Sequence, residues 1–227
     1  RRVLFRSHFE LFTDAASYNN GQKDPNKPQH SYSAALLTYK GDVVAVFGAF
    51  NPNTTNNFGE INAIRIGLIE SIRFIIEEIG LKSKEFYIDL YSDSEICVKG
   101  INEWMPSWKN RASSDGTWYS SKGEKVANQE IFKDIDYILN SKGTKKYLFK
   151  RVGESSERRY NINIYHVRGH INTSKTKDIE KAMKTFKRNN GFEISESKLN
   201  FIVNYNNKVD RVAVNNLSKI LKDGGDL

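Results

Sequence analysis

The chain lacks several features that mark specialised protein classes. Its 227 residues contain one cysteine, Cys97, so no intramolecular disulfide can form, as is usual in a reducing compartment. Only 4 prolines and 15 glycines, beside 12% aromatic residues, exclude a collagenous fibre and a disordered tail. No apolar run reaches the roughly 18 residues of a membrane span. We therefore expect a soluble cytoplasmic protein that has no membrane partner.

Positive charge is in excess and is concentrated in one region. Lys and Arg number 35 against 27 Asp and Glu, which gives a formal net charge of +8. Residues 142–188 alone carry a net charge of +10, so the remainder of the chain is slightly negative. Phosphate contacts dominate nucleic-acid affinity, and a regional basic patch therefore favours a nucleic-acid partner.

Hydrophobic periodicity predicts an α/β domain with the element order β-β-β-α-β-α-α-β-α. Alternating residues or short apolar runs predict strands, and three- to four-residue spacing predicts helices. The turn Lys40-Gly41-Asp42 predicts a hairpin. The predicted strands cover about 8–14, 31–39, 43–50, 86–91 and 161–166, and the predicted helices cover 58–80, 95–104, 128–139 and 209–221. A mixed sheet with helices on its faces follows, with the first three strands antiparallel.

The first residues of the chain and two internal segments need separate treatment. Residues 1–7 read like the in-frame translation of a sequencing-library adapter, so we interpret them as a cloning or metagenomic assembly scar. Residues 8–227 would then form one domain. Two basic segments, at about 140–160 and 171–205, are interpreted as insertions. We expect the domain to be a monomer.

Four acidic residues lie where they can converge. Asp14 is expected to end the first strand, Asp93 follows the fourth, Glu60 begins the first long helix and Asp210 opens the last. Clustered carboxylates repel unless a cation lies among them, and hard oxygen ligands favour Mg²⁺ or Mn²⁺. Each acid taken singly could instead cap a helix or form an Asx-turn.

The residues around these acids resemble the ordered motifs of type 1 ribonuclease H. The resemblance runs from about Glu10 to Leu217. Five motifs carry it, in the family's order: Leu11-Phe12-Thr13-Asp14-Ala15-Ala16-Ser17, Thr54-Thr55-Asn56-Asn57-Phe58-Gly59-Glu60-Ile61-Asn62-Ala63, Tyr91-Ser92-Asp93-Ser94, Val167-Arg168-Gly169-His170, and Asn206-Asn207-Lys208-Val209-Asp210-Arg211-Val212-Ala213.

The resemblance implies a ribonuclease H-like fold with a five-stranded mixed sheet and an endonuclease that hydrolyses the RNA strand of RNA/DNA hybrids. Asp14, Glu60, Asp93 and Asp210 would hold two Mg²⁺ ions, for which Mn²⁺ can substitute, and the products would carry 5′-phosphate and 3′-hydroxyl ends. His170 matches a histidine that assists product release or proton transfer. The biological setting, whether phage replication in a host cytoplasm, bacterial R-loop removal or a mobile element, stays open.

The resemblance also suggests which residues contact the hybrid. Thr55, Asn56 and Asn57 match a turn that contacts the minor groove, although they can equally cap the helix that holds Glu60. The segment Lys99–Arg111 resembles a basic protrusion that holds the DNA strand. We expect Trp104 and Trp118 to form a small local core. The remaining substrate-binding candidates, together with Trp104, are Trp108, Lys109, Arg111 and Asn206.

Three departures from the family pattern stand out. Ala15 follows Asp14 where the family usually has glycine, and the longer loop from Tyr18 to Pro28 replaces a glycine-rich turn. His170 and Asp210 are forty residues apart where the family has about ten. In that longer interval, Ile179, Met183 and Phe186 predict an extra helix. Its other face would carry Lys181, Lys184 and Lys187, which we interpret as an additional hybrid contact.

Two other functions remain open at this point. The same scaffold serves DNA resolvases and transposases, and a silent hybrid-binding module could share the motifs. The Thr-Asn-Asn turn and the basic protrusion argue against the first. The presence of all four carboxylates argues against the second.

Overall fold

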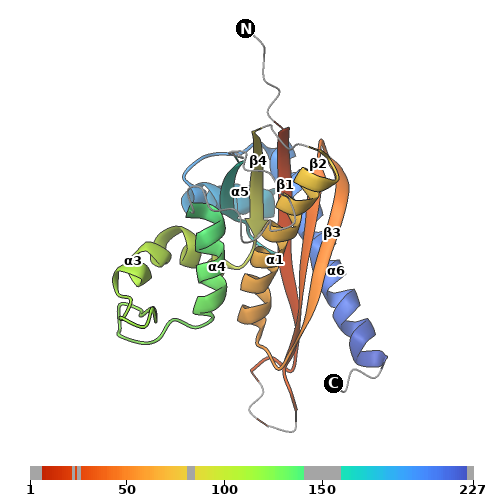
Figure 1. Cartoon of the computed structure of the whole chain (residues 1–227). Helices are drawn as coiled ribbons and strands as arrows, with labels where there is room; N and C mark the ends of the chain where they lie inside the picture. The colour runs from red at the N-terminus through yellow and green to blue at the C-terminus, as the bar shows by residue number, and fades with distance from the viewer. Residues whose placement is uncertain (1–6, 22–23, 25–26, 81–84, 141–159, 224–227) are drawn as a thin grey trace.

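A five-stranded mixed sheet forms the centre of the molecule (Figure 1). The computed structural model describes residues 7–21, 24, 27–80, 85–140 and 160–223. The strand order is β3-β2-β1-β4-β5. β1 pairs antiparallel with β2 and parallel with β4, and β5 continues the parallel half. The strands are β1 (Ser7–Tyr18), β2 (His30–Tyr39), β3 (Asp42–Pro52), β4 (Phe86–Ser92) and β5 (Tyr160–His166).

The predicted hairpin between β2 and β3 is confirmed and has a two-residue turn. Lys40 and Gly41 have φ angles of 53° and 87°. Positive φ at both central residues is what a type I′ turn requires, and this turn matches the twist of the flanking strands. Asp42, which we had placed in the turn, begins β3 instead.

β1 is longer than predicted and carries Asp14 in its interior. Asp14 pairs with Ala34 of β2, and this pairing continues to Tyr18 opposite His30. The parallel pairing with β4 ends one residue earlier, at Thr13 opposite Ser92. The expectation that Asp14 ends the strand was therefore wrong. Hydrogen bonding to β2 keeps the chain extended past the point where β4 leaves the sheet.

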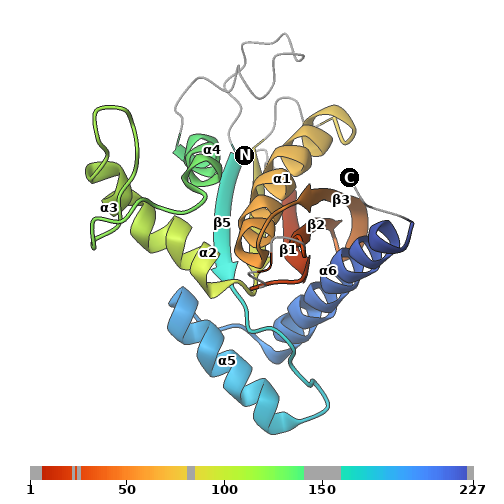
Figure 2. The ribbon, with the colours of Figure 1, turned by 90° about the horizontal axis from the view of Figure 1, so that it is seen from below.

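Helices cover both faces of the sheet (Figure 2). α1 and α4 lie on one face, whereas α6 crosses the other and α5 packs beside it against β5. The bounds are α1 (Asn56–Glu77), α2 (Glu95–Lys99), the π-helical turn η1 (Gly100–Trp104), α3 (Met105–Asn110), α4 (Gln129–Asn140), α5 (Thr176–Asn190) and α6 (Glu196–Lys222). The helix expected to end near Trp104 thus continues to Asn110.

The last helix starts well before its predicted start at residue 209. Ser195 is its N-cap, and its side chain accepts a hydrogen bond from the backbone N–H of Lys198 at 3.2 Å. Buried residues then recur along it at helical spacing, among them Leu199, Ile202 and Val203. Asp210 therefore lies in the middle of α6, and the expectation that it opens the helix was wrong.

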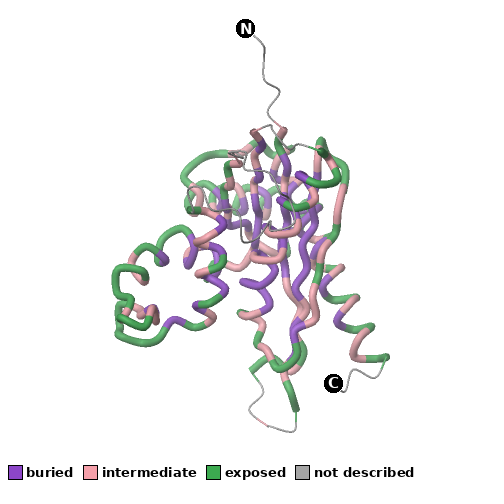
Figure 3. The backbone as a smooth tube through the Cα atoms, in the orientation of Figure 1, coloured by how far each residue is buried: buried purple, intermediate pink, exposed green. Residues whose placement is uncertain are grey.

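Two apolar clusters flank the sheet, and Figure 3 shows buried residues along the central strands and on the helices that cover them. Phe9 and Leu11 of β1 pack toward α1, whereas Phe12 packs toward α6. This split follows from the alternation of side chains along a strand. Because β1 is covered on both faces, Asp14 lies in a largely buried position.

Of the two segments interpreted as insertions, the structure describes only the second. The segment at about 140–160 lies almost wholly outside the described residues. Within 171–205 the predicted extra helix is confirmed as α5, and the segment also contains the first turns of α6. Among the described helices, none is both long enough and apolar enough to span a bilayer.

Candidate active site

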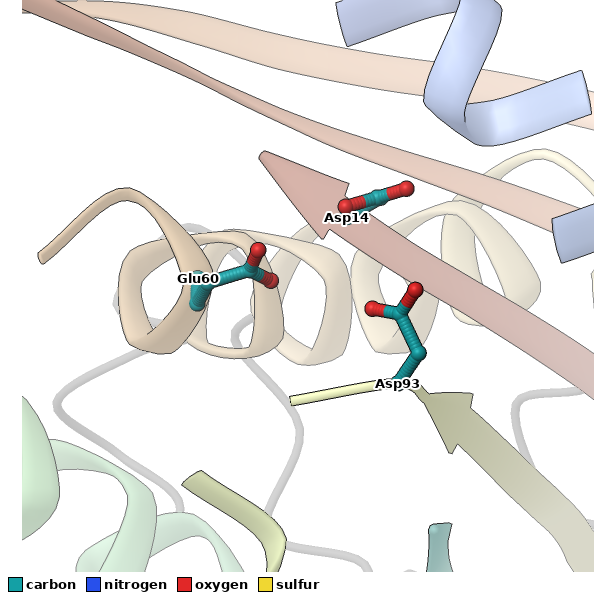
Figure 4. A group of neighbouring side chains, drawn as sticks. All are labelled: Asp14, Glu60 and Asp93. Atoms are coloured by element: carbon teal, nitrogen blue, oxygen red, sulfur yellow. The ribbon is translucent and has the colours of Figure 1, made fainter. Parts of the chain in front are cut away.

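Three carboxylates from separate elements meet at one place (Figure 4). Asp14 lies in β1, Glu60 lies in α1, and Asp93 is the residue directly after β4. One oxygen of each lies within 4.8 Å of an oxygen of the other two. In Figure 4 the three carboxylates point toward one another. This convergence matches the prediction for three of the four acids.

The backbone explains why these three acids meet. Asp14 is the first residue of β1 beyond the pairing with β4, and Asp93 is the first residue after β4 itself. Adjacent parallel strands therefore deliver both acids to the same edge. Glu60 lies in the second turn of α1, because that helix begins at Asn56 and not at the predicted Phe58.

A close approach between α1 and the sheet brings Glu60 to this edge. A Cβ on Gly59 would lie 2.9 Å from the Cβ atoms of both Ala15 and Ser31, so only glycine permits this packing. Ala15 stands where the family usually has glycine. The missing side chain at Gly59 leaves the space that the methyl group of Ala15 occupies.

Burial raises the pKa values of all three acids, and repulsion between carboxylates adds to it at Asp14 and Glu60. Desolvation is the largest cause in each case, and the charge of Asp93 adds to it at Asp14, whose pKa rises to about 8. The pKa of Glu60 is raised by burial and then by the charges of Asp14 and Asp93. Such a cluster holds its charges poorly without a neighbouring cation.

Glu60 has one carboxylate oxygen without a hydrogen-bond partner in the part of the chain that the structure describes. Its side chain is buried, and Asn56 donates a hydrogen bond to Oε1 at 3.5 Å. Oε2 is buried without a hydrogen-bond partner among the described residues. A buried carboxylate oxygen without a donor is costly unless another group binds it. Three hard oxygen donors, one of them unpartnered, are chemically suited to Mg²⁺ or Mn²⁺.

A buried polar network fixes the start of α1 to the sheet. Asn62 of α1 donates to Asn51 Oδ1 at 2.9 Å and to Ser33 Oγ at 3.3 Å. Asn51 also donates to Ser33 Oγ at 2.9 Å, and that hydroxyl donates to the carbonyl of Gly59 at 2.8 Å. The network therefore holds the backbone next to Glu60. We did not predict it, since single Asn and Ser residues give no signal until their partners are known.

α6 contributes Asn206 and Asp210 from one side of the helix. They are one turn apart and so share a face. Asn206 is buried and its side chain hydrogen-bonds Asp93. Asp210 is half-buried and lies outside the group of three. Its charge is nevertheless close enough to contribute to the raised pKa of Asp14. Its predicted role as a metal ligand stays a prediction.

The loop after β5 lies against Asp93. A Cβ on Gly169 would be 2.4 Å from Asp93 Oδ2, so the loop backbone packs directly on the carboxylate. His170 follows, exposed and with a left-handed φ of 51°. Burial raises the pKa of Asp93, while the hydrogen bond from Asn206 and the charge of His170 lower it. His170 is therefore close to Asp93, and its predicted part in product release or proton transfer stays a prediction.

Thr55 caps α1, and the neighbouring Asn56 contacts Glu60 of the site. The hydroxyl of Thr55 accepts a hydrogen bond from the backbone N–H of Phe58 at 3.3 Å. Thr55 and Asn57 are exposed, whereas Asn56 is half-buried between Glu60 and Asn20. The capping role is thus confirmed, and the exposed side chains remain available to a ligand.

The protrusion contradicts part of the tryptophan prediction. Trp118 is buried, as expected, but Trp104 is 38% exposed. Trp108 instead packs edge-on against Phe132 at 5.0 Å and over Gly100. The expectation that Trp104 belongs to a local core was wrong. Continuation of the helix through η1 and α3 turns Trp108 onto α4 and leaves Trp104 outside.

Two basic candidates of the protrusion are exposed and have local partners. Lys109 forms an ion pair with Asp136 of α4 at 2.7 Å. Arg111 donates to the carbonyl and the hydroxyl of Ser107. These contacts tie Lys109 to α4 and Arg111 to the preceding turn of α3. A direct contact with nucleic acid stays a prediction.

Comparison with known proteins identifies the family. The family model for RNase H matches residues 6–184, which include the three clustered acids. Ribonuclease H of Pseudomonas fluorescens (strain Pf0-1) is 32% identical over 168 residues, or 71% of this chain and 93% of the relative. Ribonuclease H of Legionella pneumophila (strain Lens) is 29% identical over 161 residues, or 71% of this chain and 83% of the relative.

Solved structures with a similar course of the chain include two described as RNase H. The PFV RNase H domain has a TM-score of 0.48 at 19% identity, covering 81% of this chain and 94% of that one. LC9-RNase H1, described as a type 1 RNase H with the type 2 active-site motif, has a TM-score of 0.47 at 18% identity, with coverages of 85% and 80%. Because the family model spans most of the chain and a relative covered over 93% of its length is 32% identical, this chain belongs to the ribonuclease H family of hydrolytic nucleases.

Proposed function

We propose that the protein is an endonuclease that hydrolyses the RNA strand of RNA/DNA hybrids. The observation that carries this proposal is the meeting of Asp14, Glu60 and Asp93 within 4.8 Å, in a chain of the ribonuclease H family. Three half-buried or buried acids with raised pKa values serve no evident structural purpose. Perturbed carboxylates gathered at one edge of a sheet are typical of a catalytic centre.

The carboxylates would hold two Mg²⁺ ions, with Mn²⁺ as a substitute. Asp14, Glu60 and Asp93 supply the clustered oxygens, including the unpartnered Oε2 of Glu60. Asp210 would complete the ligand set from α6. When bound, such ions activate the attacking water and stabilise the leaving 3′ oxygen, which gives 5′-phosphate and 3′-hydroxyl ends.

Residues around the carboxylates would orient them and move protons. The hydrogen bond between Asn206 and Asp93 holds that carboxylate in one orientation. Gly169 packs on the same carboxylate and limits its movement. His170 is exposed beside it and can accept or release a proton at an imidazole nitrogen, in proton transfer or in product release.

Hybrid recognition would use surfaces on both sides of the site. Thr55, Asn56 and Asn57 offer hydroxyl and amide groups suited to 2′-hydroxyls in the minor groove. On the protrusion, the exposed ring of Trp104 is suited to packing on deoxyribose, and Lys109 and Arg111 to phosphate contacts. Trp108 supports this surface from below. That the protein acts as a monomer in the cytoplasm stays a prediction.

One cleavage assay tests the proposal. Labelled RNA/DNA hybrid, double-stranded DNA and double-stranded RNA are incubated with the full chain, first with Mg²⁺ and then with EDTA. We expect metal-dependent cutting of the RNA in the hybrid alone. Cutting of double-stranded DNA would indicate a resolvase-like enzyme, and binding without cutting would indicate a silent module.

A matched pair of variants tests the site itself. Asp14→Asn removes a carboxylate from the cluster and should abolish turnover while hybrid binding is retained. Asp42→Asn makes the same chemical change at an exposed position of β3 and should leave turnover unchanged. Retained cutting by Asp14→Asn would show that Asp14 is not a ligand for the catalytic ions.

A further inference from the structure

α5 presents four cations in a single stripe on its outer face. Lys177, Lys181, Lys184 and Arg188 are separated by four, three and four residues, which places them along one side of a helix. All four are exposed. The stripe is about 16 Å long at 1.5 Å per residue. One strand of a nucleic-acid duplex carries roughly five phosphates over that length at 3.4 Å each.

The opposite face of α5 is packed against the protein. Ile179 and Ala182 are buried together with Leu199 and Val203 of α6, and Phe186 packs in the cluster between the sheet and α6. The helix is therefore held in one orientation, with its cationic stripe directed outward. A stripe on a fixed helix loses less conformational freedom on binding than one on a loose loop.

The last turn of α5 is fastened to the strand next to the active site. Asn190 accepts a hydrogen bond from the backbone N–H of His166 at 2.9 Å and donates to its carbonyl at 2.8 Å. The side chain of Asn189 hydrogen-bonds His166 Nδ1 at 2.7 Å. His166 pairs with Ser92, which immediately precedes Asp93. The stripe therefore ends beside the carboxylate cluster.

The ion pair of α5 at Lys187 and the hydrogen bond of Arg188 to Asn189 leave the two central cations of the stripe accessible. Lys187, which we had grouped with Lys181 and Lys184, forms an ion pair with Glu193 at 2.6 Å and is excluded from the stripe. Within the described part of the chain, Lys181 and Lys184 have no ion-pair partner within 4.0 Å. At the other end, Arg188 lies near α2, where its charge is one of the smaller causes that lower the pKa of Glu95, after the hydrogen bond from Lys99.

We propose that the outer face of α5 binds the phosphate backbone of the nucleic-acid duplex whose RNA strand is cut at the carboxylates. The proposal rests on the proposed function and adds a contact surface to it. Charge complementarity and the position of the stripe beside Asp93 select a polyanionic backbone as the occupant. Contacts of this kind position a duplex without reading its sequence.

The test compares two double variants with identical charge changes. Lys181→Gln/Lys184→Gln removes two exposed cations three residues apart on α5. Lys219→Gln/Lys222→Gln removes two exposed cations with the same spacing in the last turn of α6. Glutamine is a good helix former, so both variants should fold. Each pair is made with and without Asp14→Asn, which prevents cutting during binding measurements.

Hybrid affinity is measured between 50 and 200 mM salt. Each lost phosphate contact reduces the slope of log affinity against log salt concentration by about 0.9. Between 50 and 200 mM salt, the fold-decrease in affinity should therefore be roughly ten times smaller for the α5 variant than for the parent. The α6 variant should retain the parental slope. In the parent, bound hybrid should also protect Lys181 and Lys184 from acetylation, while Lys219 and Lys222 stay reactive.

The outcomes separate this inference from the proposed function. An unchanged salt slope in the α5 variant, or an equal change in both variants, would overturn the contact. Failure of hybrid to protect Lys181 and Lys184 would do the same. If the chain without Asp14→Asn does not cut hybrid at all, the proposed function fails instead. Cutting by that chain with parental slopes in both variants refutes only the role of α5.

Discussion

Removal of the Asp14 carboxylate should stabilise the metal-free protein while it abolishes activity. Asp14 is buried, and its pKa rises from 3.8 to about 8 because of desolvation and the charge of Asp93. The backbone N–H of Ala15 donates a hydrogen bond to Asp14 Oδ1 at 2.7 Å, and the side-chain oxygen of asparagine can accept it equally well. Asp14→Asn therefore removes an electrostatic cost and keeps the local contact.

The sign and size of the effect follow from the pKa shift. A raised pKa means that the folded state binds a proton more tightly than the unfolded state does, so this contribution to stability is present below about pH 3.8 and is lost as pH rises toward 8. One pKa unit corresponds to about 1.4 kcal/mol. At pH 7, ionisation of Asp14 therefore lowers the free energy of unfolding of the wild type by about 4 kcal/mol. Asparagine does not titrate and avoids this loss.

Urea denaturation in EDTA measures the difference directly. Asp14→Asn should exceed the wild type by about 4 kcal/mol at pH 7, and the gap should close toward pH 4. Asp42→Asn, at an exposed position, should change the unfolding free energy by less than about 0.5 kcal/mol. Added Mg²⁺ should narrow the gap, because the ion stabilises the folded wild type by binding it.

Two results would refute this reasoning. Equal free energies of unfolding for Asp14→Asn and the wild type at pH 7 in EDTA would show that the charged Asp14 carboxylate does not destabilise the folded protein. A difference that stays constant between pH 4 and pH 8 would show that the stabilisation does not arise from titration of Asp14. In either case the raised pKa could not be taken as a mark of the metal site.

Three further predictions concern packing at the site and at the protrusion. Gly169→Ala places a Cβ at 2.4 Å from Asp93 Oδ2, so kcat should fall at least tenfold while circular dichroism and the urea midpoint show a folded protein. Gly59→Ala should lower both stability and kcat because its Cβ meets that of Ala15, and Ala15→Gly in the same chain should partly restore them; strict additivity in the double-mutant cycle would contradict the contact. Trp104→Ala removes an exposed ring, so KM for hybrid should rise several-fold with little change in unfolding free energy, and an unchanged KM would exclude a substrate contact.

Local sequence signals predicted the elements that depend on neighbouring residues. The turn at Lys40 and Gly41 needs only two residues with positive φ, and Thr55 caps α1 through its own hydroxyl. The apolar spacing along α1 and α5 indicated both helices, because each buries one continuous face. The acids Asp14, Glu60 and Asp93 were likewise identified from the short motifs that surround them.

Tertiary contacts decided the features that depend on distant residues. β1 continues through Asp14 because β2 pairs with it there, and α6 runs unbroken through Asp210 because its first turns pack on α5. Trp108 is packed and Trp104 is exposed, the reverse of the expectation, because Phe132 of α4 contacts Trp108.

The carboxylate site itself shows the same division. Motifs in the sequence determined which acids take part, since each motif is local. How close the acids lie, and how strongly their charges repel, depends on the packing of Gly59 on Ala15 and of Gly169 on Asp93. Close approach of backbones from separate elements has no local sequence signal, because a glycine that permits it looks like any other glycine until its neighbour in space is known.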